Sequence, residues 1–320
     1  MAVVVNLDRL PEALVRRFLA LPVDRPFTSV EARELGCRFR DLRAMVAAGL
    51  LEHPMRGVYV PVRLEDTLAL RVEVLKLVVP EDCVVTDRTA GWLWGANMIL
   101  APNDHLATPK VSAFCPPGSR LRNELTNSGE RGLIPDDVVE LNGLLVTTPL
   151  RTACDLGRLL YRDQAFAALD SLAALGRFTL PELELSVTRF KGYRGVIQLR
   201  AFVPLVDPRS QSPGESILRL RWYDTALPRP ECQVEVRTPW RSSYWLDIGL
   251  PEIRFAAEYD GEEFHGDDDE AHDAERREWM RTEEGWTIVV ARRANVFGQH
   301  QDVHAMLRSG YRHALAARPH

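Results

Sequence analysis

The sequence predicts an α/β protein built from several domains. Its 320 residues exceed the roughly 250 at which a single hydrophobic core stops growing. Apolar residues follow helical spacing near the N-terminus, whereas Pro- and Gly-bounded β-rich runs alternate with helices after position 212. We therefore expect three domains: residues 1–63, a middle α+β domain at 64–207, and a mixed sheet with helices at 208–320.

The charge of the chain is unevenly distributed. The formal net charge is −5, but residues 1–63 carry ten arginines against seven acids, an excess of three positive charges. The stretch from Glu262 to Glu275 is the opposite, with eight acids and no Lys or Arg. Whole-chain charge averages over domains with different partners, so it does not exclude nucleic acid as a ligand of the N-terminal domain.

Cysteine usage and hydropathy predict a soluble cytoplasmic protein. The five cysteines are scattered, with no CxxC pair, which indicates reduced thiols. The first residues lack a basic start followed by an apolar core, so we expect no secretory signal. The most apolar stretch, 68–79, is interrupted by charged residues, which excludes a membrane-spanning helix there.

Three helices and a hairpin are predicted within residues 1–63. Apolar residues recur at helical spacing over 10–21, ending before Pro22. Thr28 and Glu31 form a capping-box pattern that starts a second helix. Gly36 suits the tight turn before a third helix at 39–48.

The third helix and the segment after it predict a winged helix-turn-helix that contacts DNA. Arg38, Arg40 and Arg43 lie at the beginning of this helix, where base edges and phosphates are met in a major groove. Residues 50–60 read as two short strands around a turn, a wing with Arg56 at its tip. The alternative is a scaffold or partner-docking module with a solvated basic face.

Motifs in the first half of the chain resemble a known family. The run TSVEARELG followed by FRDLRAMVAAGLLEHPMRGVYV resembles the winged-helix domain of AbiEi-type antitoxins of type IV toxin–antitoxin systems. TDRTAGWLWGAN and LLVTTPLRTACDLGRLL are similar to the region that follows this domain in actinobacterial relatives. The resemblance implies binding to the protein's own promoter and a cognate nucleotidyltransferase toxin as partner.

The middle of the chain is predicted to be mostly helical, with short strands and loops. Helices are expected at 64–79, 86–95, 151–160 and 163–175. No catalytic spacing is found here. The pair Trp92 and Trp94 is predicted to belong to the core.

The C-terminal third predicts a mixed sheet with helices. A helix begins at Ser212, and β-rich stretches follow it. A further helix, an apolar strand and a terminal helix complete the order. The predicted strands are 233–237, 244–250, 253–259 and 286–290, and the predicted later helix is 271–284.

Acidic residues fall at strand positions in this domain. Asp247 lies within an otherwise apolar strand, and Glu258 and Asp260 are two apart on the next, so both point to the same face. Carboxylates inside central strands are costly unless they are paired or bound to a metal. Together with Glu215 from the helix they predict a carboxylate cluster for Mg²⁺ or Mn²⁺, which activates water and stabilises charge on a phosphate.

The same acids resemble the signature of the PD-(D/E)xK nuclease superfamily, specifically its very-short-patch-repair-like branch. The resemblance covers about residues 212–300 and implies a restriction-endonuclease-like mixed sheet. It implies that Asp247 and Glu258 ligate metal with help from Glu215 and Asp260. It further implies that His265 activates water and Arg277 stabilises a phosphate, in the context of Asp273, Gly285 and Trp286.

Three features of the sequence weaken a catalytic interpretation. The lysine expected two residues after the acid is replaced by Asp260, although the repair-like branch also lacks it and relies on histidine. Glu215 follows Ser212 by three positions, which is itself a capping box. His265 adjoins an acidic stretch and can equally be a solvent-exposed residue.

Three functions are compatible with these features. The first is a metal-dependent DNA endonuclease that the winged helix positions on DNA. The alternative is a non-enzymatic transcriptional regulator or antitoxin whose nuclease-like domain has become a binding module. The third is a helix-rich interaction protein without a nucleic-acid role.

Overall fold

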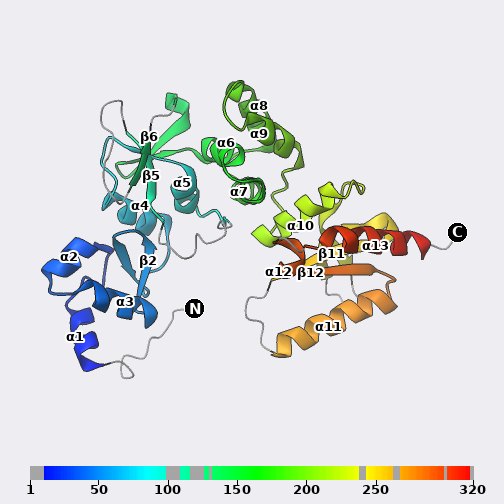
Figure 1. Cartoon of the computed structure of the whole chain (residues 1–320), viewed down its shortest axis with the longest axis horizontal. Coiled ribbons are helices and arrows are strands. Elements are labelled where there is room, and N and C mark those ends of the chain that lie inside the picture. Colours follow the sequence, from blue (N-terminus) through cyan, green and yellow to red (C-terminus); the bar gives the residue numbers. More distant parts are fainter. Residues whose placement is uncertain are drawn as a thin grey trace. The chain divides into compact units, whose positions relative to one another are not determined.

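The computed structural model describes residues 11–98, 109–115, 126–129, 132–237, 243–261, 267–298 and 301–317. Contacts divide the chain into two compact units. Unit 1 comprises Met1–Ala96 and Leu100–Leu156, and unit 2 comprises Asn97–Ile99 and Gly157–His320. Each unit combines helices with a mixed sheet (Figure 1), so the predicted mixed α/β class is confirmed.

Unit 1 begins with the three helices and the hairpin predicted for residues 1–63, to which the structure adds the unpredicted strand β1 (Phe27–Thr28). Helices α1 (Glu12–Leu19), α2 (Ser29–Glu34) and α3 (Phe39–Ala47) pack on an antiparallel sheet of order β1-β3-β2. Its strands are β1 (Phe27–Thr28), β2 (Leu51–Met55) and β3 (Val58–Pro61). Leu42 and Met45 of α3 are fully buried. The arginine-bearing face of α3 therefore points away from the core.

The predicted capping box at α2 forms only in part. Thr28 Oγ1 accepts a hydrogen bond from the backbone N–H of Glu31 at 3.1 Å, as expected of an N-cap. The Glu31 carboxylate instead pairs with the guanidinium of Arg25. A nearby cation thus takes the place of the Thr28 backbone N–H.

The second part of unit 1 contains a five-stranded mixed sheet that the sequence did not predict in detail. Helices α4 (Leu68–Lys76) and α5 (Asp87–Trp94) fall where they were expected. Trp94 is buried and donates its Nε1–H to the Thr147 carbonyl at 2.9 Å, which confirms its core role. The strand order is β6-β5-β4-β8-β7, formed by β4 (Val84–Val85), β5 (Val111–Phe114), β6 (Thr126–Gly129), β7 (Val138–Leu141) and β8 (Leu144–Thr147).

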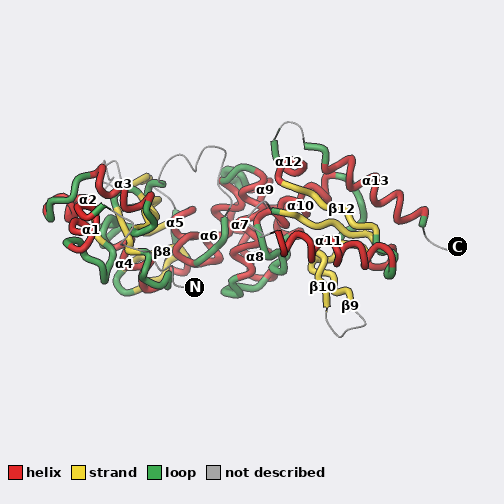
Figure 2. Tube along the Cα trace, turned by 90° about the horizontal axis from the view of Figure 1, so that it is seen from below, coloured by secondary structure: helices red, strands yellow, loops and turns green. Residues whose placement is uncertain are grey.

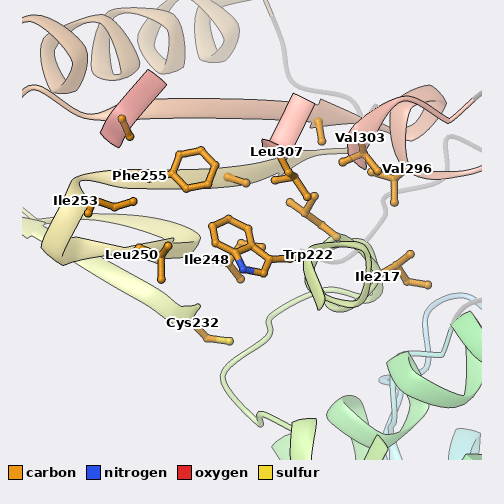
Figure 3. Packing of buried hydrophobic residues seen from close by; sticks show 14 of the residues in the cluster. Ile217, Trp222, Cys232, Ile248, Leu250, Ile253, Phe255, Val296, Val303 and Leu307 are labelled. Atoms are coloured by element: carbon orange, nitrogen blue, oxygen red, sulfur yellow. The ribbon is translucent and has the colours of Figure 1, made fainter. Parts of the chain in front are cut away.

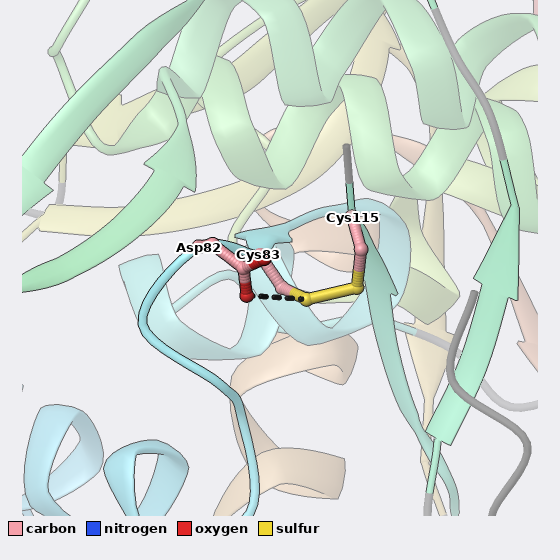
Figure 4. The surroundings of a disulfide bond; sticks show 3 residues. All are labelled: Asp82, Cys83 and Cys115. Atoms are coloured by element: carbon pink, nitrogen blue, oxygen red, sulfur yellow. Dashed lines mark hydrogen bonds between the residues drawn. A yellow bond between two sulfur atoms is a disulfide. The ribbon is translucent and has the colours of Figure 1, made fainter. Parts of the chain in front are cut away.

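A disulfide in this sheet overturns the prediction that all five cysteines are reduced. Cys83 and Cys115 are bonded across the antiparallel pair β4–β5 (Figure 4). The register pairs Val84 with Phe114, so the next positions outward, Cys83 and Cys115, lie opposite each other. Strand pairing brings together two thiols that are 32 residues apart in the sequence. The other three cysteines are buried thiols.

Unit 2 starts with a helical layer. Helix α6 (Pro149–Leu159) runs from unit 1 into unit 2 and is followed by α7 (Arg162–Ala174), α8 (Leu180–Val187) and α9 (Val196–Phe202). All residues of α7 from Gln164 to Asp170 are buried, and so are Leu172 and Ala173. A helix buried on all sides is a core element, and α7 packs against α10 (Pro213–Asp224).

The C-terminal part of unit 2 is a four-stranded sheet between helices. Strand order is β12-β11-β10-β9, and only β11 and β12 are parallel. Helices α10 and α13 share one apolar core with the sheet, in which Trp222 stacks on Phe255 (Figure 3). Trp279 and Met280 of α11 join a separate core with other sheet residues. The bounds are β9 (Glu231–Arg237), β10 (Ser243–Leu250), β11 (Phe255–Asp260), α11 (Asp267–Thr282), β12 (Thr287–Arg292), α12 (Arg293–Val296) and α13 (Val303–Ala316).

The β9–β10 hairpin changes its packing partner along its length. Cys232 and Ile248 belong to the α10 core, whereas Val234 and Leu246, two residues away, belong to the α11 core. Gln233 lies at this change with φ +52°, a left-handed conformation that is uncommon outside glycine. Figure 2 shows the hairpin extending beyond β12.

Among the described residues, no helix combines the length and apolar character needed to cross a membrane.

Candidate functional site

Glu215 is fixed at the first turn of α10. Ser212 caps this helix by accepting the N–H of Glu215 at 3.1 Å. A full capping box does not form. The Glu215 carboxylate accepts a hydrogen bond from the Ser212 side chain and also the backbone N–H of Gln211 at 2.9 Å. The side chain of Gln233 donates a second bond to the same oxygen at 3.0 Å. Glu215 is thereby held, largely buried, against the bend of β9.

Asp247 marks the point where β10 and β11 separate. The ladder between these strands pairs Ile248 with Ala257, and Asp247 and Glu258 occupy the next positions. There the backbone N–H of Tyr259 donates to Asp247 Oδ2 at 2.7 Å. A side-chain carboxylate therefore accepts a strand N–H that would otherwise bond a backbone carbonyl.

Asp247 lies within electrostatic reach of two other acids, Glu215 and Glu258. Burial raises the pKa of Glu215. Burial, followed by the nearby Glu215 and Glu258 carboxylates, raises the pKa of Asp247 to about 8. The Glu215 and Glu258 carboxylates are therefore near enough to affect Asp247, and a metal site shared by all three stays a prediction. A cluster of this kind stabilises either a proton or a cation between its oxygens.

Arginines from α11 bind Glu258. Arg276 Nη2 lies 2.8 Å from Glu258 Oε1, and Arg277 Nε lies 2.8 Å from Glu258 Oε2. Glu258 itself is buried. With both oxygens bound to guanidinium groups, it ligates a metal only if an arginine moves. In the described part of the chain, His, Cys, Asp and Glu side chains form no group of three or more that could hold a metal ion.

Asp260 lies further along β11, beside arginines. Its Oδ2 is 3.9 Å from Arg277 Nη2 and 3.8 Å from Arg292 Nε. Because Arg277 contacts both Glu258 and Asp260, the expectation that these two acids share a face is confirmed. His265 lies outside the described residues, and so does the side chain of Asp273. The catalytic roles predicted for this set remain predictions.

Sequence reasoning missed two residues of the site, Gln233 and Arg276. Gln233 follows an ordinary strand pattern, and only its left-handed backbone and its bond to Glu215 single it out. Arg276 stands next to Arg277 in the helix, so the adjacent arginine pair was a signal that the predicted signature did not include. Both residues contact the carboxylate cluster directly.

A second candidate surface lies on α3 of unit 1. The predicted DNA-contacting residues Arg38, Arg40 and Arg43 are all exposed, and so is Arg56 at the turn between β2 and β3. Asp41, on the same helix, is buried and paired with Arg17. The backbone N–H of Arg38 and the side chain of Arg17 lower the pKa of Asp41 despite its burial. The exposed part of α3 is thus rich in arginine.

The comparison with known families covers the part of the sequence that lies between α3 and α10. Residues 83–205 match the AbiEi antitoxin C-terminal domain. The AbiEi match contains both downstream motifs of the resemblance, TDRTAGWLWGAN and LLVTTPLRTACDLGRLL. It supports the AbiEi-like part of the predicted resemblance, whereas a nuclease relationship for residues 212–300 is not shown.

Two curated proteins of Mycobacterium tuberculosis are also similar to this chain. They are the uncharacterized proteins MT2308 of strain CDC 1551 / Oshkosh and Rv2248 of strain ATCC 25618 / H37Rv. Each is 35% identical over 150 residues, which is 47% of this chain and 55% of the relative. The chain thus spans about half the length of these relatives.

Ion pairs join the AbiEi-matching segment to helix α10, which packs on the sheet of unit 2. Asp170 of α7 pairs with Arg219 of α10, and both side chains are essentially inaccessible to solvent. At the other end of α7, Asp163 pairs with Arg221 of α10. Ala167 of α7 also belongs to the core that contains Trp222. The segment ends at 205, but its helices pack into the same unit as the carboxylate cluster.

Proposed function

We propose that this protein is a DNA-binding regulator of the antitoxin type. The observation that carries the proposal is the match of residues 83–205 to the AbiEi antitoxin C-terminal domain. Helices α1–α3 with the antiparallel sheet β1-β3-β2 have the element order expected of a winged helix-turn-helix, and exposed arginines begin α3. In this proposal α3 enters a major groove, Arg56 on the wing contacts the backbone, and the protein acts in the cytoplasm.

Binding to the DNA upstream of its own gene tests this function. Arg40 and Arg43 are exposed on α3, so Arg40→Ala/Arg43→Ala leaves the core intact. Each base or phosphate contact contributes about 1–3 kcal/mol, so we expect the double variant to bind its operator at least about tenfold more weakly. The matched control is Arg308→Ala/Arg312→Ala, which removes two exposed arginines from α13. Unchanged operator affinity in the α3 variant contradicts the proposal.

A cognate toxin is the second partner of an antitoxin. The resemblance implies a nucleotidyltransferase toxin, so the test is co-expression of this chain with the product of an adjacent gene of that class. Rescue of growth by the wild-type chain supports the antitoxin role. Continued toxicity at matched protein levels counts against it.

The carboxylate cluster supports a second candidate, metal-dependent hydrolysis of DNA. The specific observation is that Asp247 and Glu258 occupy the facing positions next to the β10–β11 ladder, with Glu215 near enough to raise the pKa of Asp247. Mg²⁺ or Mn²⁺ bound there would supply a polarised water and neutralise charge on a phosphate. The chain's own residues would then serve as follows: Asp247 and Glu258 hold the ion, Gln233 orients Glu215, and Arg277 faces the phosphate.

Plasmid cleavage separates the two candidates. Wild-type protein with Mn²⁺ is compared with Asp247→Asn, which keeps an acceptor for the Tyr259 N–H. Nicking or linearisation by the wild type alone supports hydrolysis. Intact plasmid, combined with no Mn²⁺ binding in calorimetry, leaves the regulator without a catalytic role.

A further inference from the structure

A cleft of about 530 Å³ lies where the parallel strands β11 and β12 end. The last residues of these strands, Asp260 and Arg292, are paired in the register and both line the cleft. Arg277, Glu278 and Arg281 line it from α11, and Asn295 lines it from α12. In open α/β sheets the carboxyl ends of parallel strands are the usual place for a ligand. The volume lies in the range of ordinary binding pockets, about 300–1,000 Å³.

The cleft presents more guanidinium groups than carboxylates. Arg277, Arg281 and Arg292 face Asp260 and Glu278, so the described part of the lining carries three positive and two negative groups. Arg292 Nε is 3.8 Å from Asp260, beyond ordinary hydrogen-bond distance, and its side chain is 65% exposed. Arg281 donates to the Ile288 carbonyl at 3.3 Å and is exposed. These two arginines keep most of their donor capacity for a ligand, since a guanidinium carries five N–H groups.

The lining selects for phosphate rather than for a base. Among the described residues that line the cleft, the apolar contribution comes from Val290 and none is aromatic. This described lining offers a nucleobase no ring to stack on, although stacking is the usual means of holding one. Planar guanidinium groups match the geometry of phosphate oxygens and bind them in pairs. The group that this cleft recognises is therefore a phosphate, and the base and sugar attached to it remain outside the cleft.

We propose that this arginine cleft binds phosphate groups of a nucleic-acid backbone, independently of sequence. Arg281 and Arg292 supply the principal contacts, and Arg277 stays bound to Glu258. The cleft is a site in unit 2, so it goes beyond the operator contacts proposed for α3 in unit 1. Its contribution is salt-dependent affinity for any duplex, with release of counterions for each phosphate bound.

The test uses the full chain and a fluorescein-labelled duplex of arbitrary sequence. Binding is measured by anisotropy across a range of salt concentrations in the Arg40→Ala/Arg43→Ala background, where contacts of α3 are removed. Adding Arg281→Ala/Arg292→Ala is expected to weaken binding and to lower the slope of log K against log salt by about 0.9 for each phosphate that is no longer neutralised. The control in the same background is Arg308→Ala/Arg312→Ala, which makes the same change in net charge on α13.

Two results overturn the proposal. One is a cleft variant whose affinity and salt slope equal those of the α13 control. The other is a competition result in which adenosine monophosphate displaces the labelled duplex from wild-type protein more effectively, per phosphate group added, than unlabelled duplex does. That result assigns the cleft to free nucleotide. Arg281→Lys/Arg292→Lys keeps both charges and is expected to retain the slope, which separates loss of charge from loss of folding. Unchanged operator affinity in the α3 variant contradicts the proposed function but leaves the comparison of the cleft variant with its α13 control intact, so the two proposals fail separately.

Discussion

Replacing Arg219 with Met tests whether the AbiEi-matching helices and the C-terminal sheet form one folded unit. Arg219 of α10 pairs with Asp170 of α7, and the two side chains are 0% and 1% exposed. Arg219 also donates to the Tyr223 hydroxyl at 3.2 Å and lies over the ring of Phe166, 4.8 Å from its centroid. Asp170 accepts the backbone N–H of Asp207 at 3.0 Å. Arg219→Met removes the cation and leaves a buried carboxylate.

The expected loss of unfolding free energy in Arg219→Met follows from what happens when one partner of a buried ion pair is removed. Removing one partner of such a pair typically costs about 3–5 kcal/mol, because the other charge stays buried without compensation. Burial already raises the pKa of Asp170, and losing Arg219 raises it further. An acid with a raised folded-state pKa stabilises the fold at low pH and loses that contribution as pH rises through this pKa. The cost of Arg219→Met is therefore larger at pH 8 than at pH 5.

Urea unfolding followed by tryptophan fluorescence measures this cost, since Trp222 is fully buried on the same helix. The double variant Asp170→Asn/Arg219→Met removes both charges, while the amide oxygen introduced at position 170 can still accept the Asp207 N–H. We expect it to recover at least about 2 kcal/mol relative to Arg219→Met alone. Arg308→Met on the exposed face of α13 is the control. A loss below about 1 kcal/mol, or no recovery in the double variant, refutes the reasoning.

Three further predictions concern the carboxylate cluster and the disulfide. Because the pKa of Asp247 is raised to about 8, its contribution to stability should fall as pH rises from roughly 4 toward 8. Asp247→Asn should make the pH slope of the unfolding free energy shallower in urea titrations with EDTA, and an unchanged slope contradicts the prediction. Gln233→Gly and Gln233→Ala both lose the bond to Glu215, but only Gly relieves the left-handed backbone, so Gly should be about 1 kcal/mol more stable than Ala; equal thermal midpoints argue against strain. Cys83→Ser/Cys115→Ser should lower the unfolding free energy of the oxidised protein by about 3–4 kcal/mol, and reductant should bring the wild type to the same level; insensitivity to reductant opposes this.

Much of the fold followed from local sequence pattern. The helices of unit 1 and the strands β9 to β12 lie within a few residues of their predicted positions, because hydrophobic periodicity and helix caps act over neighbouring residues. The same periodicity placed Glu258 and Asp260 on one face, and both contact Arg277. The five-stranded sheet of unit 1 was not predicted, since β4 pairs with both β5 and β8, and those partners lie far apart in sequence.

The sequence by itself determined which residue types occupy the sites: exposed arginines at the start of α3 and acids on α10, β10 and β11. Tertiary structure alone decided their partners. It placed Arg276 and Arg277 on the oxygens of Glu258, set Gln233 beside Glu215, and joined Cys83 to Cys115. The physical reason is that strand and helix propensities are local, whereas the charge state and ligands of a buried carboxylate depend on groups brought together by long-range packing.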